Sequence, residues 1–191
     1  LRAMIPQEHR EFRADVLEQH DLDGSELRDN ENSKSLEANS NGVLGAGLDG
    51  AKEVLEVAFA HPISLVANAL GVPPKWMLDM GKAHKVPVAA LVGAKQHAVK
   101  QAEAGVDIIV VSGTEGGGHC GSVSTMVLVP EVRRALKEYG DVPILAAGGI
   151  CTGEQMAGVM AMGADGVWCA SVFLHTMEAE TSDNRKEKIM K

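Results

Sequence analysis

The chain has 191 residues, a formal net charge of −8 and 45% hydrophobic residues, the composition of an ordinary globular protein. Its acidic balance argues against nucleic acid as a partner, and it has neither a Lys/Arg cluster for a membrane surface nor the run of about 20 apolar residues that a transmembrane helix needs. Cys120, Cys151 and Cys169 are an odd number without C-x-x-C spacing, which predicts reduced thiols in a cytoplasmic protein.

The first 50 residues differ in composition from the rest of the chain. We predict a helix around residues 6–19, followed by a solvated loop over 25–42, where apolar residues are almost absent. Residues 1–50 are therefore predicted to be a polar helix-and-loop insertion or linker, and residues 51–191 to carry the fold. The absence of an initial Met and the helix-like last residues predict a fragment of a longer protein.

From residue 51 onward, predicted helices alternate with short apolar runs typical of strands. The predicted strands are 63–70, 86–93, 106–112, 142–149 and 165–172, and the predicted helices are 51–60, 74–85, 94–104, 130–139 and 153–162. The strands are continuously apolar rather than alternating, which indicates a parallel sheet covered on both faces.

Turn and capping residues support these boundaries. Three of the helices are followed by a glycine, at Gly105, Gly140 and Gly163. Pro130 is predicted to open its helix, and Thr152 with Gln155 to form a capping box. The repeated strand–helix unit fits either a (β/α)8 barrel or an open doubly wound sheet. Five strands are too few to close a barrel, so the barrel would be incomplete.

The segment GTEGGGHCG (113–121) follows the third strand, and sites in such proteins gather at the C-terminal ends of strands. Its glycines allow backbone N–H groups to approach a bound molecule, and His119 titrates near working pH, as an acid or base must. The same composition also fits a glycine-rich turn whose histidine only caps or is solvated.

Two more strand ends carry possible binding groups. AAGGICTGEQ (146–155) places two glycines before a helix start, a ready site for phosphate. WCASVF (168–173) ends the last strand and offers the Ser171 hydroxyl. The remaining histidines, His61, His84, His97 and His175, have no metal-ligand spacing, so no metal site is predicted.

Two long stretches resemble a known family. GTEGGGHCGSVSTMVLVPEV (113–132) and VPILAAGGICTGEQMAGVMAMGADGVWCASVF (142–173) closely resemble the nitronate monooxygenases, formerly called 2-nitropropane dioxygenases. HTMEAET (175–181) and NALGVPP (68–74) fit the same family, and the resemblance covers about residues 51–181.

The resemblance implies an α/β fold, a (β/α)8 TIM barrel of which about strands four to eight are present. It further implies FMN as cofactor, with alkyl nitronates and O2 as small-molecule substrates. His119 would lie over the flavin and remove the substrate's α-proton. Backbone N–H groups of Gly148, Gly149, Ala170 and Ser171 would hold the FMN phosphate, and Gly117 and Gly118 would approach the flavin itself.

Two alternatives stay open. The flavin-dependent enoyl-[acyl-carrier-protein] reductase resembles the same family and shares the Glu-x-Gly-Gly-His loop, although the ending GVWCASVFLHTMEAET favours the monooxygenase. The chain could instead be an inactive, truncated phosphate-binding βα fragment. An oligomer is possible under each of these readings.

Overall fold

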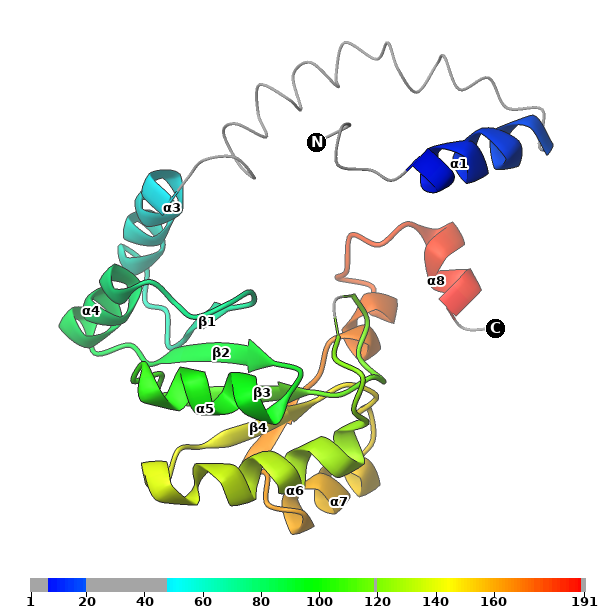
Figure 1. The fold of residues 1–191 in the computed structure, drawn as a ribbon. Helices are drawn as coiled ribbons and strands as arrows, with labels where there is room; N and C mark the ends of the chain where they lie inside the picture. Colours follow the sequence, from blue (N-terminus) through cyan, green and yellow to red (C-terminus); the bar gives the residue numbers. More distant parts are fainter. Residues whose placement is uncertain (1–6, 20–47, 119, 190–191) are drawn as a thin grey trace. The chain divides into compact units, whose positions relative to one another are not determined.

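A computed structural model describes residues 7–19, 48–118 and 120–189, which form two separate units, residues 1–60 and 61–191 (Figure 1). The first unit contains helices α1 (Gln7–Gln19) and α3 (Leu48–Phe59), so the helices predicted over 6–19 and 51–60 are confirmed. The predicted loop 25–42 lies outside the described residues, and the domain division at residue 50 stays a prediction. Within the described ranges, no helix has the length and hydropathy to cross a membrane.

The second unit is a five-stranded parallel sheet with helices between the strands. Its strands are β1 (Val66–Asn68), β2 (Val88–Val92), β3 (Ile108–Ser112), β4 (Ile144–Ala147) and β5 (Gly166–Trp168). Its helices are α4 (Lys75–His84), α5 (Lys95–Glu103), α6 (Thr125–Leu136) with the 3₁₀ turn η3 (Lys137–Tyr139), α7 (Gly153–Ala161), the 3₁₀ helix η4 (Ser171–His175) and α8 (Asp183–Ile189). All five predicted strands are present, each shorter than its apolar run.

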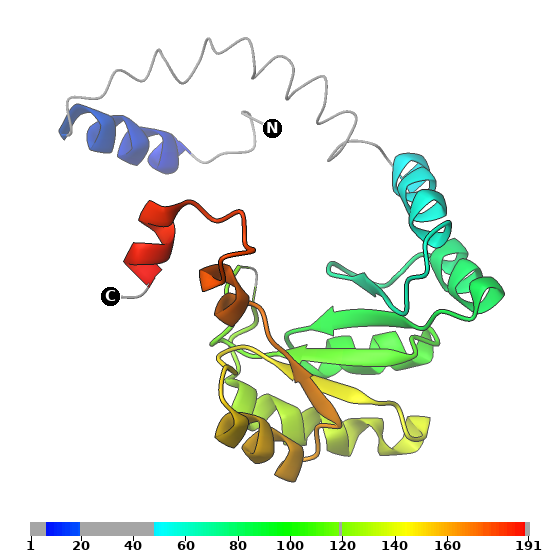
Figure 2. The ribbon, with the colours of Figure 1, turned by 180° about the vertical axis from the view of Figure 1, so that it is seen from behind.

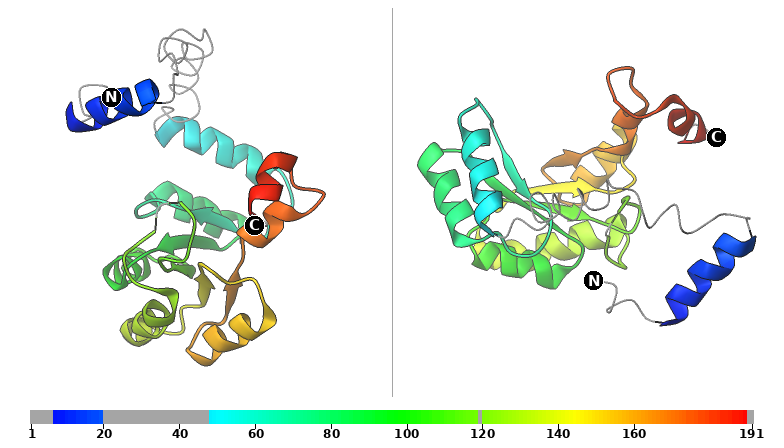
Figure 3. Two further views of the ribbon diagram at one scale, coloured as in Figure 1. Left: turned by 90° about the vertical axis from the view of Figure 1, so that its right-hand side faces the viewer. Right: turned by 90° about the horizontal axis from the view of Figure 1, so that it is seen from above.

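The strand order decides between the two folds that the sequence leaves open. The order is β1-β2-β3-β4-β5 with every pair parallel, and β1 and β5 form the two edges (Figure 3). In a doubly wound sheet the order in which successive strands are added reverses at a switch point. In a barrel each strand is added beside the previous one, always on the same side. Since right-handed crossovers then keep the helices on one face, α5 packs on β2 and β3, and α6 on β3 and β4 (Figures 1 and 2). The predicted incomplete (β/α) barrel is confirmed.

The two faces of the sheet are buried to different extents. The side chains under the helices, such as Val88, Ile109 and Ile144, are fully buried. The opposite face carries the cluster of Ala89, Val110 and Ala147, against which the partly exposed Leu65, Leu91, Ile108, Leu145 and Trp168 pack. This second face is the interior of the barrel, and it leads directly to the C-terminal ends of the strands.

The predicted glycine stops are present and connect helices to strands. Gly105 and Gly163 have φ of 83° and 110°, and the residue after each donates its N–H back into the helix, Val106 to Gln101 O and Ala164 to Val159 O. An aspartate follows in both turns. Asp107 Oδ2 accepts the Val88 N–H at 2.8 Å, and Asp165 Oδ2 accepts the Ile144 N–H at 2.7 Å. The same turn therefore ties two pairs of neighbouring strands together at their N-terminal ends.

The prediction that Pro130 opens its helix is wrong, because α6 begins five residues earlier and contains Pro130. Ser124 stands at the N-cap but its side chain makes no capping bond, and the carboxylate of Glu115 accepts the Thr125 N–H instead. Pro130 has no N–H to donate to the carbonyl of Met126, four residues earlier in the helix. Met126 is 70% exposed, so water can donate a hydrogen bond to this carbonyl instead. The capping group lies outside the helix, so residues next to the helix start do not predict where the helix begins.

Candidate functional site

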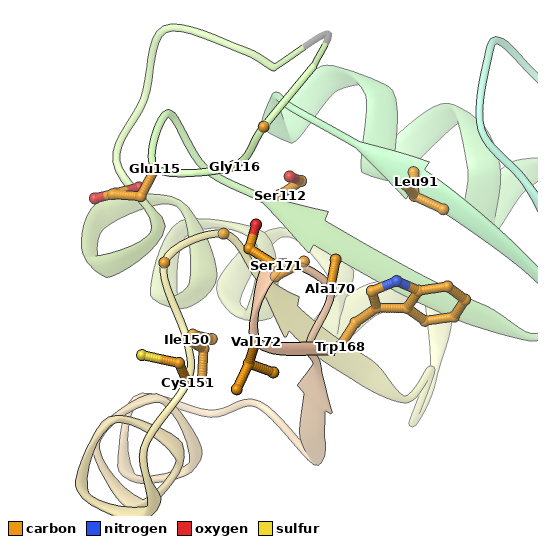
Figure 4. A pocket seen from close by; sticks show the side chains of 14 residues that line it. Leu91, Ser112, Glu115, Gly116, Ile150, Cys151, Trp168, Ala170, Ser171 and Val172 are labelled. Carbon is orange, nitrogen blue, oxygen red and sulfur yellow. The ribbon is translucent and has the colours of Figure 1, made fainter. Parts of the chain in front are cut away.

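Two cavities lie side by side at the C-terminal ends of the strands. Cavity A, of about 340 Å³, is formed by the β3–α6 loop, the β4–α7 loop and the segment from β5 into η4 (Figure 4). Cavity B, of about 490 Å³, is formed by the ends of β1 and β2 with the far part of the β3–α6 loop. Leu91, Ser112 and Gly117 line both, so the cavities adjoin one another. Both have the size of small-molecule sites.

Cavity A brings together most of the predicted site residues. Gly117, Gly148, Gly149, Ala170 and Ser171, which come from three different strand ends, all line it. Ser112 and Ser171 contribute hydroxyl-bearing side chains to its lining (Figure 4). Gly118, with φ of 84°, lines neither cavity. His119 lies outside the described residues, so its role stays a prediction.

Most glycines of these loops are required by close packing between loops. A Cβ on Gly113 would lie 2.1 Å from Thr125 N, and one on Gly121 would lie 2.0 Å from Gly93 O. Gly148 has φ of 96°, and its Cβ would lie 2.9 Å from Gly116 N. These residues let the loops after β2, β3 and β4 touch through their backbones, so here glycine serves the fold.

Gly117 is different from these glycines. A Cβ at Gly117 would meet no atom within 4 Å, and the residue is absent from the positive-φ glycines. Neither packing among the described residues nor backbone conformation therefore requires glycine at this position. An added methyl would project from the wall shared by the two cavities, where it would restrict a bound molecule.

The β4–α7 loop presents unpaired backbone donors. Among the described residues, the N–H groups of Gly148, Gly149 and Ile150 have no hydrogen-bond partner. The next two amides are occupied, because Gln155 Oε1 accepts the N–H of Cys151 at 2.8 Å and of Thr152 at 3.0 Å. Gln155 also completes the predicted capping box with Thr152 and donates its Nε2–H to Gly149 O at 2.8 Å. One side chain thus fixes the loop and leaves three consecutive N–H groups available to an anion.

Glu115 and Thr125 are site residues that the sequence analysis did not single out. The Thr125 N–H and its hydroxyl both donate to Glu115 Oε2, each at 2.9 Å. Hydrogen bonds hold the pKa of Glu115 below its usual value. The bond from the Thr125 backbone has the largest effect, and the bonds from the Glu115 backbone and the Thr125 hydroxyl add to it, so Glu115 is ionised at neutral pH. A glutamate just before three glycines was the only sequence signal for this contact.

Cavity B is mostly apolar. Its lining includes Leu70, Leu91 and Val92, with His97 and Cys120 as its titratable groups. From the sequence, His97 was judged only for metal-ligand spacing and Cys120 only as a reduced thiol, and neither was predicted as a site residue. Of the Lys and Arg residues that the structure describes, none lines either cavity. Among the described residues there is also no cluster of three His, Cys, Asp or Glu side chains suited to a metal ion.

Comparison with known proteins shows which family the chain belongs to. The family model of nitronate monooxygenase matches residues 8–191. Rv1533 of Mycobacterium tuberculosis, which is named as a monooxygenase, is 47% identical over 189 residues, covering 99% of this chain and 48% of the relative. The chain spans about half the length of the curated relatives it matches, or less.

Two solved structures share the fold at useful sequence identity. The nitroalkane oxidase of Streptomyces ansochromogenes superposes with a TM-score of 0.67 at 27% identity, covering 75% of this chain and 43% of that protein. FabK of Thermotoga maritima gives a TM-score of 0.66 at 32% identity, covering 74% and 44%. With a family match across nearly the whole sequence and the expected barrel strands in place, this chain belongs to the nitronate monooxygenase family.

Proposed function

We propose that the chain contributes the FMN site of a flavin-dependent oxidoreductase that oxidises alkyl nitronates with O2. One observation carries the proposal. Cavity A collects small residues from three strand ends, presents three consecutive unpaired N–H groups, and has in its wall Gly117, where neither the described contacts nor a positive φ requires glycine.

The residues of cavity A fit the two ends of FMN. The N–H groups of Gly148 and Gly149 suit a phosphate, and the Ser171 hydroxyl at the start of η4 lines the same cavity. Gly117 lies on the wall towards cavity B, where a flat ring would need close approach of the backbone. The phosphate end would therefore lie at β4 and β5, and the ring end at β3.

The chemistry divides between cofactor and protein. A bound flavin supplies the electron transfer between substrate and oxygen, which side chains cannot provide. We propose that His119 accepts the α-proton of the nitroalkane, a carbon acid that one neutral imidazole can deprotonate. The largely apolar lining of cavity B suits the alkyl part of such a substrate.

A second candidate is reduction of an enoyl thioester, as in the flavin-dependent enoyl-[acyl-carrier-protein] reductases. The similarity to FabK, at higher sequence identity than to the nitroalkane oxidase, favours it. The ending GVWCASVFLHTMEAET (166–181), which resembles the monooxygenases more closely, and the match to the nitronate monooxygenase family model argue against it. We therefore place the nitronate reaction first.

The test combines cofactor binding with oxygen uptake. We expect the purified protein to bind FMN, and the loaded protein to consume O2 when ethyl nitronate is added. His119→Asn should lower turnover of the neutral nitroalkane by about 100-fold or more, because the base is lost. The matched control is His61→Asn, at an exposed position that lines neither cavity.

Three results would contradict the proposal in different ways. Rapid reduction of the flavin by NADH without any response to a nitronate would favour the reductase. Unchanged kinetics in His119→Asn would remove this residue from the mechanism. A chain that binds phosphate but no FMN would support the alternative of an inactive βα fragment.

A further inference from the structure

The contact between Glu115 and Thr125 joins the two loops of cavity A. Besides Glu115 Oε2, the Thr125 hydroxyl lies 3.1 Å from Ala147 O and 3.2 Å from Gly148 O. Thr125 is only 5% exposed. A single buried hydroxyl therefore lies within hydrogen-bond distance of the β3–α6 loop, at Glu115, and of the end of β4, and it can donate its one hydrogen to either.

We propose that Glu115 and Thr125 form a latch that positions the glycine loop, residues 115–118, against the β4–α7 loop and thereby sets the affinity of the site for a flavin. The first part, the positioning of the loop, concerns only the protein's own contacts. The second part, the effect on flavin affinity, rests on the function proposed above. Glu115 is in this sense a positioning residue. Figure 4 shows its carboxylate directed away from Ser112 and Ser171, so it acts through the backbone that it holds.

Backbone packing around the latch shows why it fixes the loop. A Cβ on Gly149 would lie 2.9 Å from Glu115 Cβ, and a Cβ on Gly148 would lie 2.9 Å from Gly116 N. The two loops are thus in direct contact at Glu115 and Gly116, immediately before Gly117. Because only one residue separates Glu115 from Gly117, anchoring the glutamate restricts where the cavity wall can lie.

The carboxylate suits this task better than a neutral group. The Thr125 N–H is a first-turn amide of α6, and the side chain of Ser124 does not cap it. An ionised carboxylate accepts this N–H and the hydroxyl together and interacts favourably with the N-terminal end of the helix dipole. The Thr125 hydroxyl has a single hydrogen, which it donates either to Glu115 or to one of the Ala147 and Gly148 carbonyls, whereas the Thr125 N–H bonds Glu115 in both cases.

The first measurement tests the latch without any cofactor. Amide hydrogen exchange of the ligand-free chain should quicken at Thr125 and over residues 113–118 in Glu115→Ala, by about tenfold or more, because a charge-assisted bond is lost. Glu131→Ala, on the same helix as Thr125, is the matched control, since Glu131 is bonded to Lys95 and not to Thr125. Equal exchange in Glu115→Ala and the unmodified chain would overturn the latch.

The second measurement tests its consequence for the flavin, with FMN as the probe and quenching of flavin fluorescence as the readout. Thr125→Val removes only the hydroxyl and should weaken FMN binding about tenfold, whereas Thr125→Ser retains the hydroxyl and should bind nearly as the unmodified chain does. Thermal unfolding of the two Thr125 variants shows whether they fold, and Glu115→Gln removes the charge while keeping an oxygen that can accept the Thr125 N–H.

The outcomes separate the latch from the proposed function. If Thr125→Val folds and binds FMN as tightly as the unmodified chain, the latch does not set flavin affinity and the proposal fails. If the unmodified chain binds no FMN, the proposed function fails, and the exchange measurement alone decides the latch. Loss of FMN affinity in both Thr125→Val and Thr125→Ser would also contradict the latch. Thr125→Ser keeps the hydroxyl, so the loss would then not depend on the hydroxyl.

Discussion

Replacing Gly117 by alanine separates ligand binding from folding. The added Cβ meets no atom within 4 Å, and the φ of Gly117 is not positive. Glycine-to-alanine changes at such positions raise the free energy of unfolding by about 0.4–1 kcal/mol, because the unfolded chain loses freedom. We therefore expect the ligand-free chain to be as stable as before or slightly more stable.

The bound state should respond in the opposite direction. The methyl group would occupy the wall shared by cavities A and B, where we place the flavin ring. Forcing one extra carbon into a packed contact costs about 1–3 kcal/mol, which corresponds to a loss of FMN affinity of roughly 5- to 150-fold. Urea unfolding measures the first quantity, and quenching of flavin fluorescence measures the second.

Two alanine variants provide controls. Gly158→Ala adds the same methyl in open space within α7 and should stabilise the helix by about 0.5–1 kcal/mol without changing FMN affinity. Gly148→Ala combines a φ of 96° with a Cβ 2.9 Å from Gly116 N, so it should destabilise even the ligand-free chain. If Gly117→Ala binds FMN within about twofold of the unmodified chain, the ring does not lie against Gly117 and the placement of the flavin is refuted.

Two further predictions concern the supports of the sheet and of the β4–α7 loop. Asp165→Asn should lower the free energy of unfolding by about 1 kcal/mol at neutral pH, measured with urea against the exposed control Asp141→Asn, because Asp165 accepts the Ile144 N–H and pairs with Arg133. Burial raises the pKa of Asp165, but the Ile144 and Arg133 bonds lower it more, so this stabilisation is present above the unfolded pKa and is lost as the pH falls through the folded one. The variant and the unmodified chain should therefore converge in acid, and a constant difference would contradict this. Gln155→Ala should cost about 1 kcal/mol of stability and weaken FMN binding, since the capping box and the Gly149 bond are lost, whereas Gln96→Ala on the surface of α5 should do neither.

Much of the secondary structure follows from local sequence. Short apolar runs mark the five strands, since a parallel strand buried on both faces needs apolar side chains throughout. Gly105 and Gly163 end their helices because the left-handed conformation there excludes most other residues. The Thr152–Gln155 capping box lies within four residues, so the spacing alone predicts it.

The cavity itself depends on contacts between distant residues. The interlocking glycines pair Gly93 with Gly121 and Gly113 with Thr125, and neither pairing has a signature in a single sequence. The start of α6 was misplaced for the same reason, because its cap is Glu115, ten residues before Thr125. Local patterns show that a loop is flexible enough to approach another, but the partner is set by the packing of the sheet.

By itself, the sequence determined the order and type of the elements, the helix ends at glycine and the positions of the glycine-rich strand ends. These depend on interactions within a few residues, where side-chain chemistry and backbone conformation are directly coupled. Only the tertiary structure decided that the strands lie in chain order as part of a barrel, that Glu115 binds Thr125, and that Gly117 faces open space while its neighbours are packed. Those features arise because parallel pairing brings loops from successive strands to one edge of the sheet, where residues far apart in sequence come into contact.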